Sequence, residues 1–242
     1  MFELVEGAVW KSVFGESMSS DNQQLKEFQV EWENIQDFNN FKVLVINDRK
    51  KSLRDEIISF LKLVLSLNKE ALLRGDYKEC AERMLILLGE TPSRRIHWLK
   101  PGAFHKARWM AIMIYGAKMY AFSDQFNYTS EKIKNLHRIC LFKALIFIKV
   151  WLGAPKAPGT PLNDLSFWKT LNFYSKIDPE ISQAALTSFM RHFWCLTEET
   201  VIFAFFSKKV SDPEKKKLCQ LFSSMNTIRN RHSFPACPLF LI

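Results

Sequence analysis

Two His-x-x-Cys pairs are the residues whose types and spacing most directly suggest metal chemistry. They are His137 with Cys140 and His192 with Cys195, and both fall in segments with helical apolar spacing. Residues three apart share a helix face, so two such pairs could supply the nitrogen and sulfur ligands of a zinc site. Both cysteines also lie among apolar residues, where packing in the core is the commoner role. Core packing is therefore the favoured interpretation, and zinc binding is the alternative.

Two adjacent carboxylates form a second candidate site. Glu198 and Glu199 follow Trp194 and precede the apolar run at 201–206. A carboxylate that pointed into a core there would be costly to bury unless it bound a metal ion or a partner. From the residues alone, exposure of both side chains to solvent is favoured. The chain has no Gly-x-Ser-x-Gly sequence and no glycine-rich phosphate loop, which argues against serine-hydrolase, Rossmann and P-loop sites.

A basic and aromatic segment could contact nucleic acid. His105 and Arg108 share a helical face and Trp109 follows directly; such a set can bind a phosphate backbone and stack on a base. The same residues could equally be a buried arginine and a core tryptophan. Lys208 and Lys209 form one of several short basic clusters in a chain of net charge +9. Scattered lysines of this kind more often lie on solvated helix faces than on a binding surface.

The composition is that of an ordinary globular protein. The chain has 242 residues, of which 48% are hydrophobic and 24% charged, and it holds 21 Phe and 7 Trp. A single domain with a bulky core is therefore expected. The 5 cysteines form no Cys-x-x-Cys motif. This usage is typical of reduced thiols and predicts an intracellular location, in the cytoplasm or the nucleus.

No membrane-spanning segment is expected. The longest apolar run, 139–152, is shorter than a bilayer span and is interrupted by Lys143 and Lys149. The first residues, Met-Phe-Glu-Leu-Val-Glu, lack the basic start of a signal peptide. Neither a membrane nor a small-molecule substrate is therefore predicted as a partner.

Helical apolar spacing dominates the chain and predicts a mainly α fold. We expect an irregular helical domain of about eight to ten helices, with at most one or two short strands, for which the β-branched stretch 41–47 is the candidate. The expected helices cover 2–14, a short segment around 25–32, 53–73, 76–88, 103–122, 130–152, 165–174, 179–206 and 213–224. Asp-Pro-Glu at 178–180 and at 212–214 are the strongest helix starts, and Gly15 and Gly89 are natural helix ends.

Four stretches of the chain resemble one group of animal proteins. The longest is 99–126, with Pro101-Gly-Ala-Phe-His-Lys-Ala-Arg-Trp-Met near its start. The others are Phe14-Gly-Glu-Ser with the Leu25-Lys-Glu-Phe and Trp32 that follow, 157–165 with its Pro161-Leu-Asn-Asp-Leu, and Phe189-Met-Arg-His-Phe-Trp-Cys-Leu-Thr-Glu-Glu-Thr-Val. The resemblance covers residues 1–222. This group is similar to hAT-type transposases in a domesticated or decayed form.

The resemblance implies an RNase H-like core in which two Asp and one Glu bind two divalent metal ions, interrupted by a helical insertion. It implies that Glu198 or Glu199 is the vestige of the third acid, and that Arg108-Trp109 matches the Arg-Trp that opens the insertion. In the relatives the Asp-bearing strands precede the matched part, so Met1 is expected to be an internal methionine of a longer ancestral frame. Since two-metal chemistry needs several carboxylates around ions about 4 Å apart, the ancestral Mg²⁺ site is expected to be incomplete and no cofactor is expected.

The resemblance also divides the chain into regions. Residues 1–48 would be helices from the end of the RNase H-like core, and 49–152 the insertion-like region. A Pro- and Gly-rich loop at 153–161 would separate these from the C-terminal helices at 162–224. The tail at 225–242 has no helical face and is expected to be disordered.

These expectations lead to three function hypotheses. The leading one is a transposable-element-derived helical fragment that is catalytically incompetent alone and retains binding to nucleic acid, DNA first of all. The second is a protein–protein interaction module, since core surface once covered by missing strands would be exposed and apolar. The third is a zinc-binding protein that uses the two His-x-x-Cys pairs. Binding to phosphates weakens steeply with salt, which separates the first from the second, and metal analysis tests the third.

Overall fold

The chain is described here by a computed structural model, which places residues 2–15, 23–67, 75–92, 96–102, 111–153, 160–191, 211–213, 215–216 and 220. These ranges are helical with connecting turns and extended segments, and none of their residues is in a strand. The helices are α1 (Phe2–Phe14), α2 (Gln23–Glu31), α3 (Lys51–Leu67), α4 (Gly75–Leu87), α5 (Ala111–Ala121), α6 (Ser130–Phe142), α7 (Ile148–Gly153), α8 (Thr160–Tyr174) and α9 (Pro179–Met190). The mainly α architecture expected from the sequence is confirmed.

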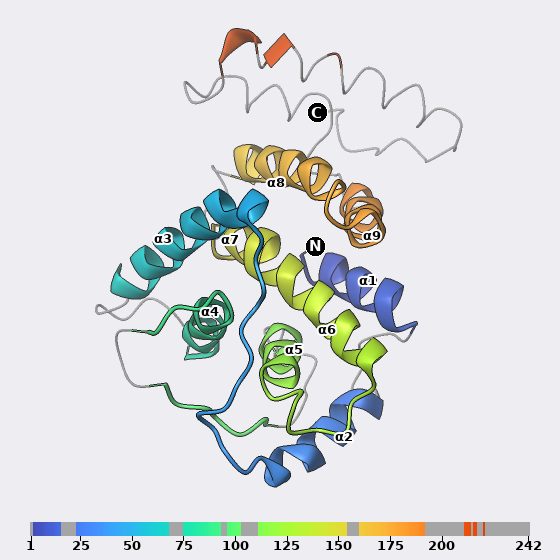
Figure 1. Cartoon of the computed structure of the whole chain (residues 1–242). Coiled ribbons are helices and arrows are strands. Elements are labelled where there is room, and N and C mark those ends of the chain that lie inside the picture. The colour runs from blue at the N-terminus through green and yellow to red at the C-terminus, as the bar shows by residue number, and fades with distance from the viewer. Residues whose placement is uncertain are drawn as a thin grey trace, which may run out of the picture.

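Helix α5 lies at the centre of the bundle, with α4 and α6 against it and α2 at one end (Figure 1). Every residue of α5 except Ile112 is buried. This agrees with its sequence, which is apolar nearly all round and therefore predicts a central helix. Lys118 is the charged residue of this helix and is itself buried, so it requires partners inside the protein.

Helices α6 and α7 form one continuous rod that matches the helix expected at 130–152. A π-helical turn (Lys143–Phe147) joins them, which widens the backbone by one residue at that point. The side chain of Thr129 caps the start of α6 by accepting from the backbone N–H of Lys132, as is usual at helix N-termini. All five residues of the π-helical turn are buried, which places the turn in the core.

The first and last helices of the described part, α1 and α9, meet in the fold. Helix α1 packs along α9, and α8 packs on α9 and on the α6–α7 rod (Figure 1). Buried residues from α1, α5, α6 and α9 belong to one hydrophobic core. The described parts of the regions expected at 1–48, 49–152 and 162–224 therefore contribute residues to one core.

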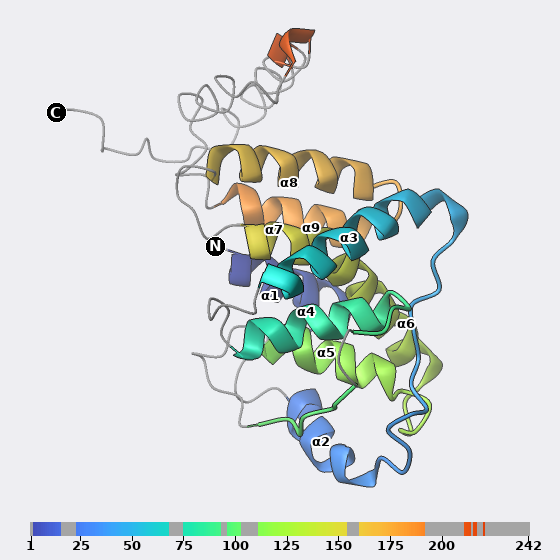
Figure 2. The same cartoon turned by 90° about the vertical axis from the view of Figure 1, so that its left-hand side faces the viewer.

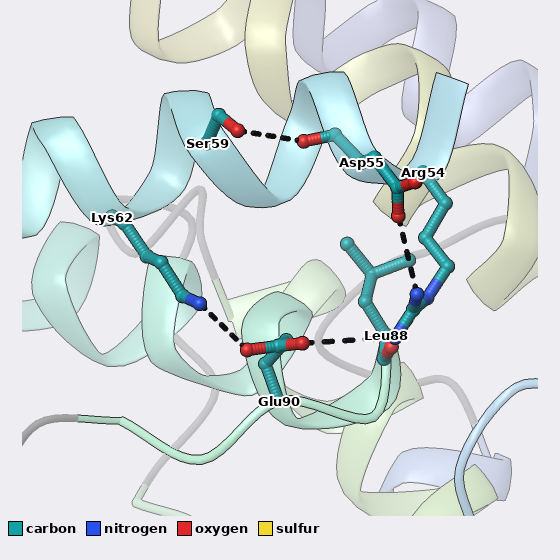
Figure 3. Close-up of polar contacts among 6 residues, drawn as sticks. All are labelled: Arg54, Asp55, Ser59, Lys62, Leu88 and Glu90. Carbon is teal, nitrogen blue, oxygen red and sulfur yellow. Dashed lines mark hydrogen bonds and ion pairs between the residues drawn. The ribbon is translucent and has the colours of Figure 1, made fainter. Parts of the chain in front are cut away.

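The end of α4 shows how local sequence fixes the chain path. Gly89 has φ +83°, and the N–H groups of Gly89 and Glu90 donate to the carbonyls of Ile86 and Leu85. This is the Schellman arrangement, for which glycine is favoured because an L side chain is strained at positive φ. Helix α3 holds the same turn from outside: Arg54 Nε donates to Leu88 O at 2.8 Å and Lys62 Nζ contacts Glu90 Oε2 at 2.6 Å (Figure 3).

The start of α9 follows the Asp-Pro-Glu signal. Asp178 Oδ1 accepts from the N–H of Ile181 at 3.1 Å, and Pro179 is the first helical residue. Arg138 of α6 then donates to both carboxylate oxygens of Asp178, at 2.7 and 2.9 Å, and to Glu180 at 2.8 Å. The helix cap therefore also ties α9 to α6.

The expected strand at 41–47 is an extended segment without a strand partner. The N–H groups of Lys42 and Leu44 donate to Ala121 O and Leu87 O, which are carbonyls at the C-terminal ends of α5 and α4. Carbonyls at the C-terminal end of a helix lack partners within their own helix. Here they accept the backbone hydrogen bonds that a neighbouring strand would otherwise accept. The segment that contains this stretch, 35–47, runs along the outside of the molecule from α2 to α3 (Figure 2).

Helix boundaries differ from expectation on the C-terminal side. Helix α8 begins at Thr160, inside the expected loop 153–161 and five residues before the expected start at 165. Pro161 causes no break because a proline in the first turn has no helical N–H bond to lose. Helix α9 ends at Met190 with Arg191 as its C-cap, and residues 192–206 of the helix expected at 179–206 lie outside the described residues. At the second Asp-Pro signal, Asp212 and Pro213 are helical, and the expected tail 225–242 is not among the described residues.

Among the described residues, no helix has the length and apolar character that a bilayer crossing requires.

Candidate functional site

Segment 96–102 directly precedes the residues that were predicted to bind nucleic acid, and the structure describes it. His105, Arg108 and Trp109 themselves fall in 103–110, outside the described residues. Segment 96–102 is extended, and its backbone carbonyls accept hydrogen bonds from side chains of three helices. We call these donors the carbonyl clamp; they are Arg83 to His97 O, Lys118 to Leu99 O, and both Tyr115 and Gln29 to Gly102 O.

The clamp places two cations in the protein interior. Arg83 and Lys118 are only 2% and 1% exposed, and both lie beside Glu79, whose Oε1 is 2.7 Å from Lys118 Nζ and 3.7 Å from Arg83 Nε. Burial lowers the pKa of Lys118, and the Glu79 carboxylate opposes that shift. Because an unpaired buried cation is strongly unfavourable, the carbonyls of 96–102 are part of what stabilises the two charges.

Aromatic rings complete the surroundings of these cations. The guanidinium of Arg83 lies 4.4 Å from the ring centroid of Trp98, and Lys118 Nζ lies 5.4 Å from that of Trp32. Trp98 and Trp32 both meet the ring of Phe122 edge-on, at 4.7 and 5.7 Å. Cations over ring faces gain electrostatic attraction, so segment 96–102 is fixed through Trp98 as well as through its carbonyls.

The opposite face of the segment is turned to solvent. His97 and Leu99 are exposed, and Lys100 forms an ion pair with Glu33 at the surface. The backbone is therefore held from below while these side chains face outward. A fixed backbone with exposed side chains is the arrangement that recognition surfaces use, because little ordering is left to occur on binding.

A second extended stretch lies beside the first. The ring of Phe41 meets that of Trp98 at 5.5 Å, which joins segment 35–47 to segment 96–102. Val43 and Val45 are 42% and 79% exposed, whereas Leu44 between them is buried. Alternation of this kind is typical of extended backbone, and it leaves two β-branched side chains facing solvent.

Gln125 fixes the turn that begins this stretch. Its Oε1 accepts from the N–H groups of Gln36 and Asp37 at 3.2 Å each, and its Nε2 donates to the carbonyls of Asp37 and Asn40 at 2.7 and 2.8 Å. One amide therefore uses all of its common hydrogen-bonding capacity on a single turn. The turn presents Phe38, which is 40% exposed and whose ring rests on those of Trp32 and Phe122.

His137 and Cys140, the first of the two His-x-x-Cys pairs, both contact other groups of the protein. Cys140 is buried and its Sγ lies 3.3 Å from Gly116 O. The ring of His137 packs 5.6 Å from that of Tyr120 and bonds to the carbonyl of Val45. Burial, followed by the charge of Lys50, lowers the pKa of His137, and the bond to Val45 opposes this. Burial also raises the pKa of Cys140 to about 12, so the thiol is protonated at neutral pH.

The other expected site residues lie outside the described ranges. These are His192, Cys195, Glu198, Glu199, Lys208 and Lys209. Within the described residues no group of three or more His, Cys, Asp or Glu side chains is placed to hold a metal ion. Of the five cysteines, Cys80 and Cys140 are described, and both are free and buried.

Sequence reasoning did not identify the buried charges of the clamp. Arg83 and Lys118 belong to no motif that would single them out, although Lys118 stands in a helix that is otherwise apolar. Such a lysine must find an anionic or carbonyl partner in the fold, and this was the available signal. The partner itself could not be named, since Glu79 lies on a different helix and Leu99 in a loop.

No family model, curated protein or solved structure matches this chain.

Proposed function

We propose that this chain is a transposase-derived helical fragment that has no catalytic activity alone and binds nucleic acid through residues 96–110. The support comes from the resemblance of its sequence to hAT-type transposases and from the carbonyl clamp. The clamp fixes the backbone up to Gly102, and His105, Arg108 and Trp109 follow within the next seven residues. An arginine and a tryptophan after a fixed backbone suit phosphate contact and base stacking.

The charge of the molecule supports an anionic partner. The net charge is +9, and several surface carboxylates of the described part are already paired with cations. They are Glu33 with Lys100, Glu56 with Lys149, Glu90 with Lys62 and Arg54, and Asp124 with Lys42. The excess positive charge therefore remains available to steer a polyanion toward the protein.

Lack of catalysis is proposed from what the ancestral reaction requires. Strand transfer by the related enzymes uses three acids around two ions, and this chain offers Glu198 or Glu199 as one of them. Among the described residues no group of three or more His, Cys, Asp or Glu side chains is placed to hold a metal ion. An incomplete site would bind Mg²⁺ weakly and would not position a nucleophile.

Fluorescence anisotropy with a labelled oligonucleotide tests the proposal. We expect binding that weakens by a factor of ten or more between about 50 and 200 mM salt, since several phosphate contacts are needed to hold DNA. Arg108→Ala and Trp109→Ala should each reduce affinity. Lys134→Ala is the matched control because it removes one positive charge from an exposed position on α6, outside the segment 96–110. Equal losses in Arg108→Ala and Lys134→Ala would contradict a local binding site.

A protein partner is the second candidate. The observation that favours it is the exposure of Phe38, Val43, Val45 and Leu99, at 40%, 42%, 79% and 47%, on two adjoining extended segments. An apolar surface of this kind is typical of protein contacts. Such binding would persist at high salt and would be lost in Val45→Asp. Binding that survives Val45→Asp would argue against this surface.

Zinc binding stays a third candidate, and it depends on His192 and Cys195 joining His137 and Cys140. Metal analysis of the purified protein after dialysis tests it directly. We expect no stoichiometric zinc, because Cys140 already contacts a carbonyl within the core and its thiol pKa is raised.

We also propose an intracellular location for this protein. The free thiols of Cys80 and Cys140 support it.

A further inference from the structure

Asp164 interrupts the apolar face of α8. The residues that follow it on the same helix face are Phe167, Trp168, Leu171 and Tyr174, which are 0%, 5%, 0% and 0% exposed. Asp164 is itself 1% exposed. The carboxyl group of Asp164 is therefore buried together with the apolar face of α8, where an ionised carboxylate is unfavourable.

Among the residues that the structure describes, neither oxygen of Asp164 has a hydrogen-bond partner. Most buried side-chain oxygens in native proteins have one, and the exceptions call for a physical explanation. The neighbouring Asn163 does not help, because its amide nitrogen donates to Val150 O at 3.3 Å. An ionised, unpartnered carboxylate at this depth would be strongly unfavourable.

The charged groups on the elements that pack against α8 are all engaged elsewhere. The π-helical turn contributes Lys143, which pairs with Glu6, and α7 contributes Lys149, which pairs with Glu56 at the surface. Helix α9 contributes Glu180, which pairs with Arg138. On α8 itself, Lys169 follows Asp164 by five residues and so projects from a different side of the helix.

Tyr174 is the remaining titratable group on α8, and burial raises its pKa so that it stays neutral. For Asp164, burial is the cause that raises the pKa of the carboxyl to about 6. Its ordinary value is 3.8. The acid is therefore neutral when buried at mildly acidic pH and ionises inside the range in which proteins function.

We propose that Asp164 makes the seating of α8 on the rest of the core dependent on pH. When the carboxyl is protonated, the first turns of α8 stay packed against α7, the π-helical turn and α9. When the carboxyl ionises, the charge is relieved by exposing it to water, and the N-terminal half of α8 opens. This device goes beyond the proposed nucleic-acid binding, since Asp164 lies outside residues 96–110.

The size of the effect follows from the two pKa values. An acid that titrates near 6 when buried and near 3.8 when exposed shifts an opening equilibrium by on the order of 100-fold from below pH 4 to above pH 7. The sign is fixed: opening increases as pH rises, because only the ionised acid favours the exposed state. Between pH 5 and pH 8 the expected change is about tenfold.

Hydrogen exchange of the full chain, read by mass spectrometry and corrected for the intrinsic effect of pH, measures this opening. In the wild type, amides of 163–170 should become about tenfold less protected between pH 5 and pH 8, while amides of 113–121 in α5 should not change to the same degree. Asp164→Asn, which has the same shape and no charge, should show no such trend. Asp124→Asn is the control, because Asp124 is exposed and should leave the trend as in the wild type.

Three results would overturn the proposal. They are a wild-type protection of α8 that is independent of pH, an Asp164→Asn protein with the wild-type trend, and equal changes in α5 and α8, which would indicate global unfolding. Circular dichroism checks that Asp164→Asn folds. If it does not fold, the acid makes a contact that the fold requires, and the proposal also fails. Asp164→Leu separates charge from hydrogen bonding, and it should also be independent of pH.

Discussion

Glu6 of α1 and Lys143 of the π-helical turn form an ion pair in the core, with Oε1 and Nζ 2.8 Å apart and side-chain exposures of 3% and 1%. Lys143 Nζ also donates to Ile112 O at 3.0 Å. Gly116 leaves the space for it, because a Cβ at that position would lie 3.2 Å from Nζ. One lysine therefore joins α1, α5 and the α6–α7 rod.

Removal of the charge on Glu6 should strongly destabilise the fold. Glu6→Gln leaves a buried ammonium without its counter-charge, which typically costs about 3 kcal/mol or more. Urea unfolding followed by circular dichroism measures the change. Glu56→Gln is the matched control, since Glu56 pairs with Lys149 at the surface and such pairs contribute about 1 kcal/mol or less.

A double variant separates the pair from its two charges. Glu6→Leu with Lys143→Met replaces the ions with apolar groups, and such replacements are often neutral or stabilising. The double variant should therefore be more stable than Glu6→Gln alone. A double variant that is less stable than Glu6→Gln would contradict this prediction. It would show that the two ions stabilise the fold by more than their attraction for each other.

Gly89→Ala tests the turn that closes α4. Alanine is strained at the φ of +83° found here, and we expect a loss of about 1 kcal/mol in the free energy of unfolding. Gly7→Ala is the opposite case. Gly7 lies inside α1 with nothing within 4 Å of an added Cβ, so alanine should stabilise by up to about 1 kcal/mol. The prediction fails if both substitutions change stability in the same direction.

Asp178 gives a pH dependence of known sign. Burial alone would raise the pKa of its carboxyl, but hydrogen bonds from Arg138 and from the N–H of Ile181 outweigh it and leave the pKa below 3.8. A carboxyl whose pKa is lower in the folded state stabilises the fold at pH values above its pKa in the unfolded state. This stabilisation is lost as the pH falls below about 4. Asp178→Ala should remove it together with the helix cap, which costs about 2 kcal/mol at pH 7.

The loss in Asp178→Ala should shrink as the pH is lowered from 7 toward 2, because a growing fraction of the wild-type protein then has this carboxylate protonated. Thermal unfolding at several pH values measures this. Glu180→Gln removes the outer partner of Arg138 and keeps Asp178; since Glu180 is 53% exposed, its effect should be small at every pH. A constant difference between wild type and Asp178→Ala from pH 7 to 2 would contradict the assignment.

Local signals were sufficient for three helix ends, at Gly15, Gly89 and Asp178, and insufficient for the contacts between helices. Gly15, Gly89 and the Asp178-Pro179 start behave as expected because caps act within one turn of chain. The stretch 41–47 was the candidate for a short strand, and its residues are not in a strand. Its partners are helix-end carbonyls at Leu87 and Ala121, which no pattern within the stretch could indicate.

The buried charges illustrate the same limit. Lys118 and Lys143 both interrupt apolar helices, and the sequence shows that they need partners. Which carboxylates supply them depends on tertiary packing: Glu79 is 39 residues before Lys118 and Glu6 is 137 residues before Lys143. The candidate site was likewise predicted only as far as His105, Arg108 and Trp109, while the clamp that holds 96–102 depends on contacts between α2, α4 and α5.

Gln29→Ala tests whether the clamp positions the proposed nucleic-acid surface. Gln29 Nε2 donates to Gly102 O at 2.8 Å across 73 residues of sequence, and its loss leaves Tyr115 as the donor to that carbonyl. We expect a local change of about 1 kcal/mol, seen as faster hydrogen exchange in 99–102. Oligonucleotide affinity should fall by about tenfold or less, in line with the same free energy.

Gln23→Ala on the same helix is the control. Gln23 is exposed and bonds to Glu27 within α2, so its loss should change neither the exchange of 99–102 nor the affinity. If Gln29→Ala speeds the exchange and leaves affinity unchanged, the clamp orders the segment without serving the binding surface. If both variants lower affinity equally, the effect comes from α2 itself, and the link between Gly102 and the residues that follow it is wrong.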